Sequence, residues 1–93
     1  MTKAKEESKY RHADHVSWRK VENEAVVLDL NSSDYFSLNE TGLLIWEKIG
    51  EGSTLEGLAE AVASEYDVEA KAAKADVKKL VDELVKRKLI EPA

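Results

Sequence analysis

The stretch from Asp34 to Gly42, read as Asp-Tyr-Phe-Ser-Leu-Asn-Glu-Thr-Gly, is the point at which the hydrophobic pattern of this chain changes. Before it, apolar residues tend to alternate with polar ones, which is typical of strands, and after it they recur at helical spacing. Asn39 is a favourable helix N-cap, and Glu40 adds negative charge to the first turn of a helix. The stretch therefore predicts an edge strand that leads directly into a capped helix.

Two more strands are predicted upstream. A weak two-residue period runs from Val16 to Val21, and a clearer one runs from Ala25 to Leu30. Residues 22–24 between them are typical of a tight turn, and so are residues 31–34. The third strand spans Tyr35 to Leu38. We expect a three-stranded antiparallel meander with one apolar side.

The register of the second and third strands follows from their apolar faces. Val26, Leu28 and Leu30 share one face of the second strand, and Phe36 and Leu38 share one face of the third. A short loop would pair Leu30 with Phe36 and Leu28 with Leu38. This register would place all five side chains on the same side of the sheet.

Three helices are predicted after Asn39. The first is ended by residues 50–52, and the second begins at a Ser-x-x-Glu capping box, Ser53 to Glu56, and runs to Tyr66. Asp67 is expected to cap a third helix that reaches about Lys88. The expected core stripe of that helix is Ala73, Val77, Leu80, Val81, Leu84 and Val85. Two acid-then-base pairs four residues apart, Asp82 with Lys86 and Glu83 with Arg87, are expected on its surface. The order β-β-β-α-α-α predicts an α+β winged helix-turn-helix.

Composition limits the class of protein. The 93 residues are enough for one small domain, and 43% hydrophobic with 35% charged residues is typical of a folded one. We expect a flexible N-terminal tail over residues 1–14 and a single domain over residues 15–91. The absence of cysteine excludes disulfides and thiolate chemistry. No apolar run approaches the ~20 residues of a membrane span, and the N-terminus is unlike a secretory signal, so a cytoplasmic protein is expected.

The chain shows no catalytic constellation. No Asp, Glu or Ser is paired with a candidate base on a glycine-shaped loop, so we expect a binding protein and not an enzyme. His12, Asp14 and His15 are potential metal ligands, but ligands in a flexible tail lack fixed geometry and supporting hydrogen bonds. We therefore expect neither a metal site nor a cofactor.

Several runs resemble the PqqD-like family of precursor-peptide recognition elements. They are residues 26–30, the run from Tyr35 to Gly42, Ile45-Trp46, the Gly-x-Ser-Thr of residues 50–54, residues 65–68, Asp76-Val77 and residues 84–90. The most specific part is Leu-Asn-Glu-Thr-Gly followed by Ile-Trp. The resemblance covers roughly residues 16–90. It implies a winged-helix fold and the binding of the leader segment of a ribosomally made precursor peptide.

The resemblance also implies how and where the leader binds. In the family, the leader joins the edge of the third strand as an antiparallel strand, in the groove against the last helix, and is presented to a modifying enzyme. Such partners include radical SAM enzymes, cyclases and leader peptidases. In this chain the matching candidate residues are Tyr35, Phe36, Ser37, Leu38, Asp76, Val77, Lys79, Leu80, Glu83, Leu84 and Arg87.

Two alternatives from other classes remain at the level of sequence. A winged helix is also a DNA-binding fold, and the last predicted helix is rich in lysine. However, the net charge is −5, acids alternate with those lysines, and the second predicted helix carries three glutamates and no Lys or Arg. A purely structural subunit that docks on a larger enzyme is the other alternative, and it would bind a partner without binding a precursor peptide.

Overall fold

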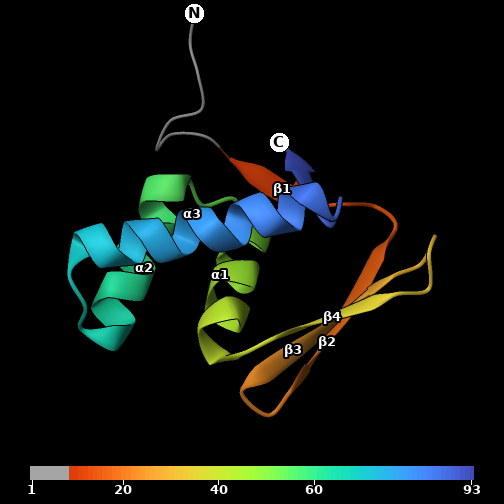
Figure 1. Ribbon diagram of the computed structural model, residues 1–93, viewed down its shortest axis with the longest axis horizontal. Helices are drawn as coiled ribbons and strands as arrows, with labels where there is room; N and C mark the ends of the chain where they lie inside the picture. The colour runs from red at the N-terminus through yellow and green to blue at the C-terminus, as the bar shows by residue number, and fades with distance from the viewer. Residues whose placement is uncertain (1–8) are drawn as a thin grey trace, which may run out of the picture.

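The computed structural model describes residues 9–93, and these form two small sheets and three helices (Figure 1). In chain order the elements are β1 (Tyr10–His12), β2 (Val16–Val21), β3 (Glu24–Asp29), β4 (Tyr35–Leu38), α1 (Glu40–Gly50), α2 (Leu55–Tyr66), α3 (Ala70–Lys86) and β5 (Ile90–Pro92). Strands β2, β3 and β4 form an antiparallel sheet in that order, and the three helices follow it. The predicted α+β order is therefore confirmed.

The segment before β2 belongs to the fold. β1 pairs antiparallel with β5, so that Tyr10 lies opposite Pro92 and His12 opposite Ile90. Ala13 is buried, and its N–H donates to the Leu89 carbonyl over 3.0 Å. The expected tail over residues 1–14 is thus wrong for residues 10–13, while residues 1–8 lie outside the described part of the chain. A strand of three residues is too short to show a period, and its partner is at the other end of the sequence.

The sheet register differs from the predicted one by three residues. Val27 pairs with Phe36 and Ala25 with Leu38, whereas Leu28 pairs with Tyr35. An odd shift turns every side chain of β3 to the other face, so Ala25 and Val27 are buried and Leu30 is 57% exposed. The cause is the turn, because Asp29 N–H donates to the Asp34 carbonyl and places Leu30 in the loop.

The helix starts show one confirmed cap and two corrections. The Asn39 side chain accepts the Gly42 N–H at 2.9 Å, as predicted. The cap of α2 is Thr54 and not Ser53, since the Thr54 hydroxyl accepts the Gly57 N–H at 3.0 Å. Asp67 does not cap α3; it takes a left-handed conformation, with φ of 53°, at the end of α2. Such a backbone ends a helix, so α3 begins only at Ala70.

Helix α3 packs by the predicted stripe in part. Ala73, Val77, Val81 and Leu84 are buried, Leu80 is half-buried and Val85 is exposed. Across residues 9–93, none of the helices combines the length and apolar character needed to cross a bilayer.

Trp46 of α1 is the centre of the core and is completely buried. The His12 ring stacks on it, with centroids 3.9 Å apart, and Trp18 of β2 meets both rings edge-on. His12 Nε2 also hydrogen-bonds the Trp46 carbonyl over 2.9 Å. Gly50 is required beside this stack, because a Cβ there would lie 2.9 Å from His12 Cε1.

The two histidines considered as metal ligands have separate partners, since His15 faces Asp29 at 3.8 Å.

The half-buried position of His12 predicts a pH-dependent stability. Burial lowers the pKa of His12, and the hydrogen bond to the Trp46 carbonyl offsets this only in part. The folded state therefore prefers neutral His12: its full stability holds above the unfolded-state pKa of about 6.5 and declines as the pH falls from there through the lowered folded pKa. Urea unfolding between about pH 7.5 and pH 5 measures this decline. His12→Phe should flatten the profile in this window, and an unchanged slope in the variant would contradict the assignment.

Candidate peptide-binding groove

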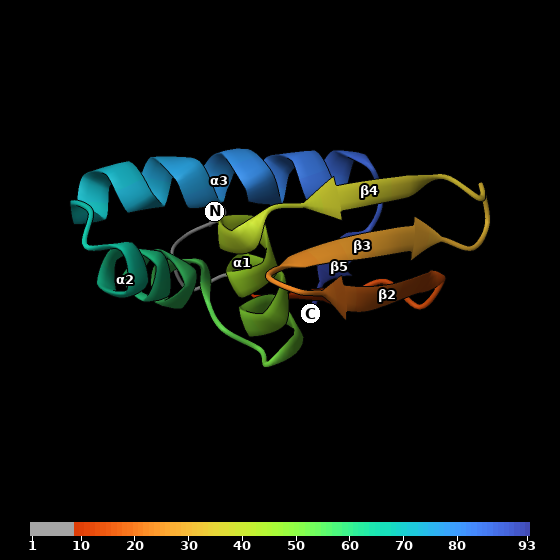
Figure 2. The ribbon, with the colours of Figure 1, turned by 90° about the horizontal axis from the view of Figure 1, so that it is seen from below.

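The outer edge of β4 carries unpaired backbone groups. Asp29 N–H donates to the Asp34 carbonyl at 2.8 Å, which marks this pair as a hydrogen-bonded position of the β3–β4 ladder. Bonded and non-bonded pairs alternate in an antiparallel ladder, so the N–H and C=O groups of Tyr35 and Ser37 point away from β3. Within residues 9–93, no strand pairs with this edge. In Figure 2, β4 is the strand of this sheet on the side of α3.

An apolar hollow of about 370 Å³ lies between β4, the start of α1 and α3. Its lining residues are Phe36, Ser37, Leu38, Asn39, Thr41, Gly42, Ile45, Asp76 and Leu80. Gly42 allows the first turn of α1 to approach β4, because a Cβ would stand only 3.1 Å from Leu38 Cβ. We call this space the apolar hollow.

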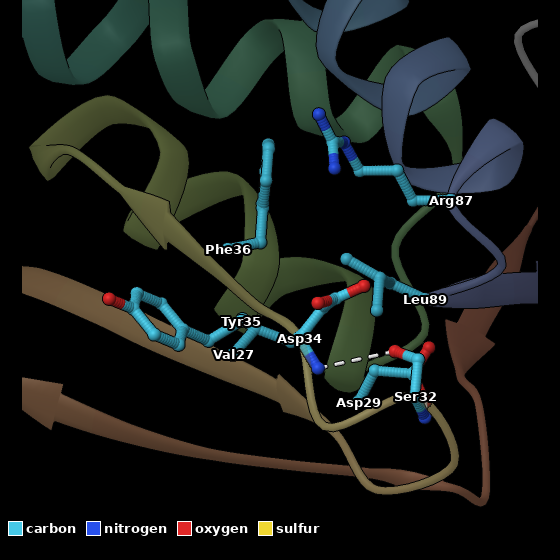
Figure 3. A pocket seen from close by; sticks show the side chains of 8 residues that line it. All are labelled: Val27, Asp29, Ser32, Asp34, Tyr35, Phe36, Arg87 and Leu89. Atoms are coloured by element: carbon cyan, nitrogen blue, oxygen red, sulfur yellow. Dashed lines mark hydrogen bonds between the residues drawn. The ribbon is translucent and has the colours of Figure 1, made fainter.

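A second hollow, of about 270 Å³, lies at the other end of β4, beside the β3–β4 turn (Figure 3). Its lining residues are Val27, Asp29, Ser32, Asp34, Tyr35, Phe36, Arg87 and Leu89. Val27, Phe36 and Leu89 make its apolar part, and Asp34 and Arg87 approach it from the turn and from the end of α3. We call this space the turn hollow.

Asp29 holds the wall of the turn hollow in place. Its Oδ1 accepts the backbone N–H groups of Asn31 at 2.8 Å and Ser32 at 3.2 Å. Desolvation acts to raise the pKa of Asp29, but these hydrogen bonds and the neighbouring His15 outweigh it and lower the pKa below its ordinary value. Asp29 is therefore ionised at neutral pH and is already engaged by the turn.

Arg87 lines the turn hollow. Its Nε donates to Glu83 at 2.6 Å, and its guanidinium carbon stands 4.7 Å from the centre of the Phe36 ring. The predicted pair of Glu83 with Arg87 is confirmed. The predicted pair of Asp82 with Lys86 is not found, because Asp82 binds Lys78 at 3.1 Å.

The structure brings together most of the residues selected from the sequence, but four of them line neither hollow. Phe36, Ser37, Leu38, Asp76 and Leu80 line the apolar hollow, and Tyr35, Phe36 and Arg87 line the turn hollow. Val77 and Leu84, however, are at most 2% exposed and belong to the core behind the groove, so they cannot contact a ligand directly. Lys79 is exposed and lines neither hollow, and Glu83 also lines neither hollow, although it accepts the bond from Arg87.

Sequence reasoning missed the contribution of α1 and of the turn. Asn39, Thr41, Gly42 and Ile45 line the apolar hollow, and Asp29 and Asp34 line the other. The signal for the first group is present in the sequence, since residues 38–42 are the most specific part of the family resemblance. Capping and periodicity alone, however, explain these residues as a helix start.

The fold and this groove define a small winged-helix domain in which an open sheet edge, that of β4, lies beside the last helix. Residues 24–90 match the family model described as coenzyme PQQ synthesis protein D (PqqD). The chain belongs to the PqqD family.

Two solved structures are similar over nearly the whole chain. One is described as TbiB1 in complex with the TbiA(beta) leader peptide; it has a TM-score of 0.83 and 28% identity, and the match covers 87% of this chain and 94% of that one. The other is described as lasso peptide synthetase B1 complexed with the leader peptide; it has a TM-score of 0.82 and 30% identity, and the match covers 90% and 99% of the two chains. No curated protein of similar sequence was found.

Proposed function

We propose that this protein binds the leader segment of a ribosomally synthesised precursor peptide by adding it as an antiparallel strand to β4. The observation that carries the proposal is the open edge at Tyr35 and Ser37, flanked by two hollows of about 370 and 270 Å³. Strand addition uses such an edge for affinity and side-chain pockets for selectivity. The two similar proteins are described in complex with leader peptides, which supports a leader as the ligand here.

The energetics require both parts of the groove. Two residues with outward backbone groups offer up to four ladder bonds, each worth about 1 kcal/mol net, which does not offset the cost of ordering a flexible peptide. Each leader side chain buried in a hollow adds roughly 1.5–3 kcal/mol. For such a complex we expect a Kd in the micromolar to high-nanomolar range, about −8 to −10 kcal/mol.

The bound leader would present the rest of the precursor to a second protein. We propose a modifying or leader-cleaving enzyme as that partner, such as a radical SAM enzyme, a cyclase or a leader peptidase. The protein itself would act without chemistry of its own. Among residues 9–93, no group of three or more His, Cys, Asp or Glu side chains is arranged to hold a metal ion.

Proline substitution tests strand addition directly. The Ser37 N–H points to the open edge, so Ser37→Pro removes a donor that only an added strand would use. Phe36→Pro is the matched control for the other side of the strand, because the Phe36 N–H faces β3 and its loss weakens the sheet itself. We expect Ser37→Pro to keep a cooperative unfolding transition and to lose leader affinity at least about tenfold. The measurement is an amide-shift titration with a candidate leader peptide. Unchanged affinity in Ser37→Pro would exclude addition at this edge.

The DNA-binding alternative gains no support from the surface of α3. Lys78 is paired with Asp82 and Arg87 with Glu83, so these cations are already partly neutralised. A DNA-binding protein would show an electrophoretic shift that weakens steeply with salt.

A further inference from the structure

We infer that the groove selects its leader by charge order, taking an acidic residue opposite Phe36 and, two residues later, a basic residue opposite Asp34. The inference rests on the proposed function and specifies the chemistry of the peptide. Its basis is the placement of the Arg87 guanidinium over Phe36 and of the Asp34 carboxylate two residues away along the chain.

Arg87 is prepared to receive a carboxylate. Its Nε is held by Glu83 at 2.6 Å and its guanidinium stands over the Phe36 ring. A guanidinium has five N–H donors, and the four on the Nη atoms lie beyond the bond made by Nε. These two contacts restrain the side chain and keep the guanidinium beside Phe36 (Figure 3). A carboxylate there could accept two parallel bonds.

Asp34 supplies the opposite charge. Its backbone N–H is satisfied by the Ser32 hydroxyl and its carbonyl by Asp29 N–H. The Asp34 carboxylate has neither a hydrogen bond nor an ion pair with any of residues 9–93, although it lines the same hollow as Arg87. Asp29 differs, because its carboxylate is engaged by the turn. Asp34 is thus the carboxylate of this hollow that is available to a ligand.

The geometry of paired strands predicts from these positions which residue types the leader should carry, and in which order. Leu38, Phe36 and Asp34 are two residues apart and point to the same face of β4, and the residues directly across an added strand share that face. An antiparallel leader meets them in the order Leu38, Phe36, Asp34. The expected pattern is therefore an apolar residue for the apolar hollow, any residue, an acid, any residue, and a base.

A leader that carries both an acid and a base fits the charged residues of the groove better than a leader of one charge sign. A purely acidic strand would bring its carboxylates close to Asp34, Asp29 and Glu83, and a purely basic strand would meet Arg87. A leader with an acid and then a base places the acid beside Arg87 and the base beside Asp34, which avoids both repulsions. Such charge-assisted contacts across a groove fix register more than they add affinity.

A display selection with random peptides tests the pattern and requires no candidate leader sequence. A library of peptides about a dozen residues long is selected on the full chain, on Arg87→Glu, on Asp34→Lys and on Arg19→Glu. Arg19 lies on β2 opposite Val26 and lines neither the apolar hollow nor the turn hollow, so its reversal is the matched control. Circular dichroism and urea unfolding verify that each variant is folded. Selected peptides are then resynthesised, and the acid and the base are each replaced by the opposite charge.

The wild-type chain and Arg19→Glu should enrich the same apolar-x-acid-x-base pattern. Arg87→Glu should change the acid to a base, and Asp34→Lys should change the base to an acid. Each reversal in a resynthesised peptide should weaken wild-type binding by about tenfold. Three results would overturn the inference but not the proposed function. They are peptides that bind as a strand without the two charges, peptides that carry the two charges in the opposite order, and a pattern that is unchanged in both groove variants. Failure to enrich any peptide whose amide shifts map to β4 would instead overturn the proposed function.

Discussion

Replacing Leu80 with aspartate is expected to abolish leader binding. Leu80 is half-buried and lines the apolar hollow with Phe36 and Ile45. A carboxylate there must remain hydrated, so the leader side chain loses its burial of roughly 1.5–3 kcal/mol and would also desolvate a charge. The combined effect is a loss of affinity of at least about a hundredfold. Isothermal titration with the leader measures it.

Two further variants make this result interpretable. Phe36→Asp changes the same groove from the strand side and should give a similar loss. Val85→Asp adds the same charge to the same helix, at a residue that is exposed and lines neither hollow, and should leave affinity unchanged. Normal binding by folded Leu80→Asp and Phe36→Asp would show that the leader binds elsewhere.

Trp46→Ala is expected to give the largest loss of stability. The side chain is completely buried, carries the His12 stack and meets Trp18 edge-on, so its removal leaves a cavity at the centre of the core. A large-to-small change of this kind costs about 3–5 kcal/mol. In a domain of this size that corresponds to a fall in Tm of roughly 15–30 °C. Thermal unfolding followed by circular dichroism measures it.

The controls for Trp46→Ala separate volume from polarity. Trp46→Phe keeps an aromatic ring under His12 and removes a buried Nε1 that has no hydrogen-bond partner among the described residues. It should therefore cost much less than the alanine variant. Tyr35→Ala removes a side chain that is 71% exposed and should change stability by less than about 0.5 kcal/mol. Equal losses in the alanine and phenylalanine variants would contradict this account of the core.

Local patterns in the sequence predict the elements because each carries its own signal. The cap at Asn39, the helical spacing of α2 and the stripe of α3 each depend on residues only a few positions apart. The open strand at Tyr35 to Leu38 is predictable for the same reason, as is the Glu83–Arg87 pair.

Features that depend on distant or turn-specific contacts are not predictable in this way. The register of β3 and β4 depends on one hydrogen bond in the turn, from Asp29 N–H to the Asp34 carbonyl, which periodicity does not reveal. The helical spacing of apolar residues also does not distinguish those that line a groove from those that lie in the core. It therefore gives Val77 and Leu84 as groove residues together with Leu80. Ser53 and Thr54 are similar caps by residue type, and only the helix phase decides between them.

The pairing of β1 with β5 has a consequence for how this chain folds. Tyr10 and Pro92 meet across almost the entire sequence, and closing so long a loop is among the most costly contacts in entropy. During synthesis β5 leaves the ribosome after all the other described elements, so the β1–β5 pairing and the bond from Ala13 N–H to the Leu89 carbonyl form only after those elements have emerged. The wall of the turn hollow that Leu89 provides is therefore finished late, and a nascent chain would acquire its open edge before it acquires the full groove.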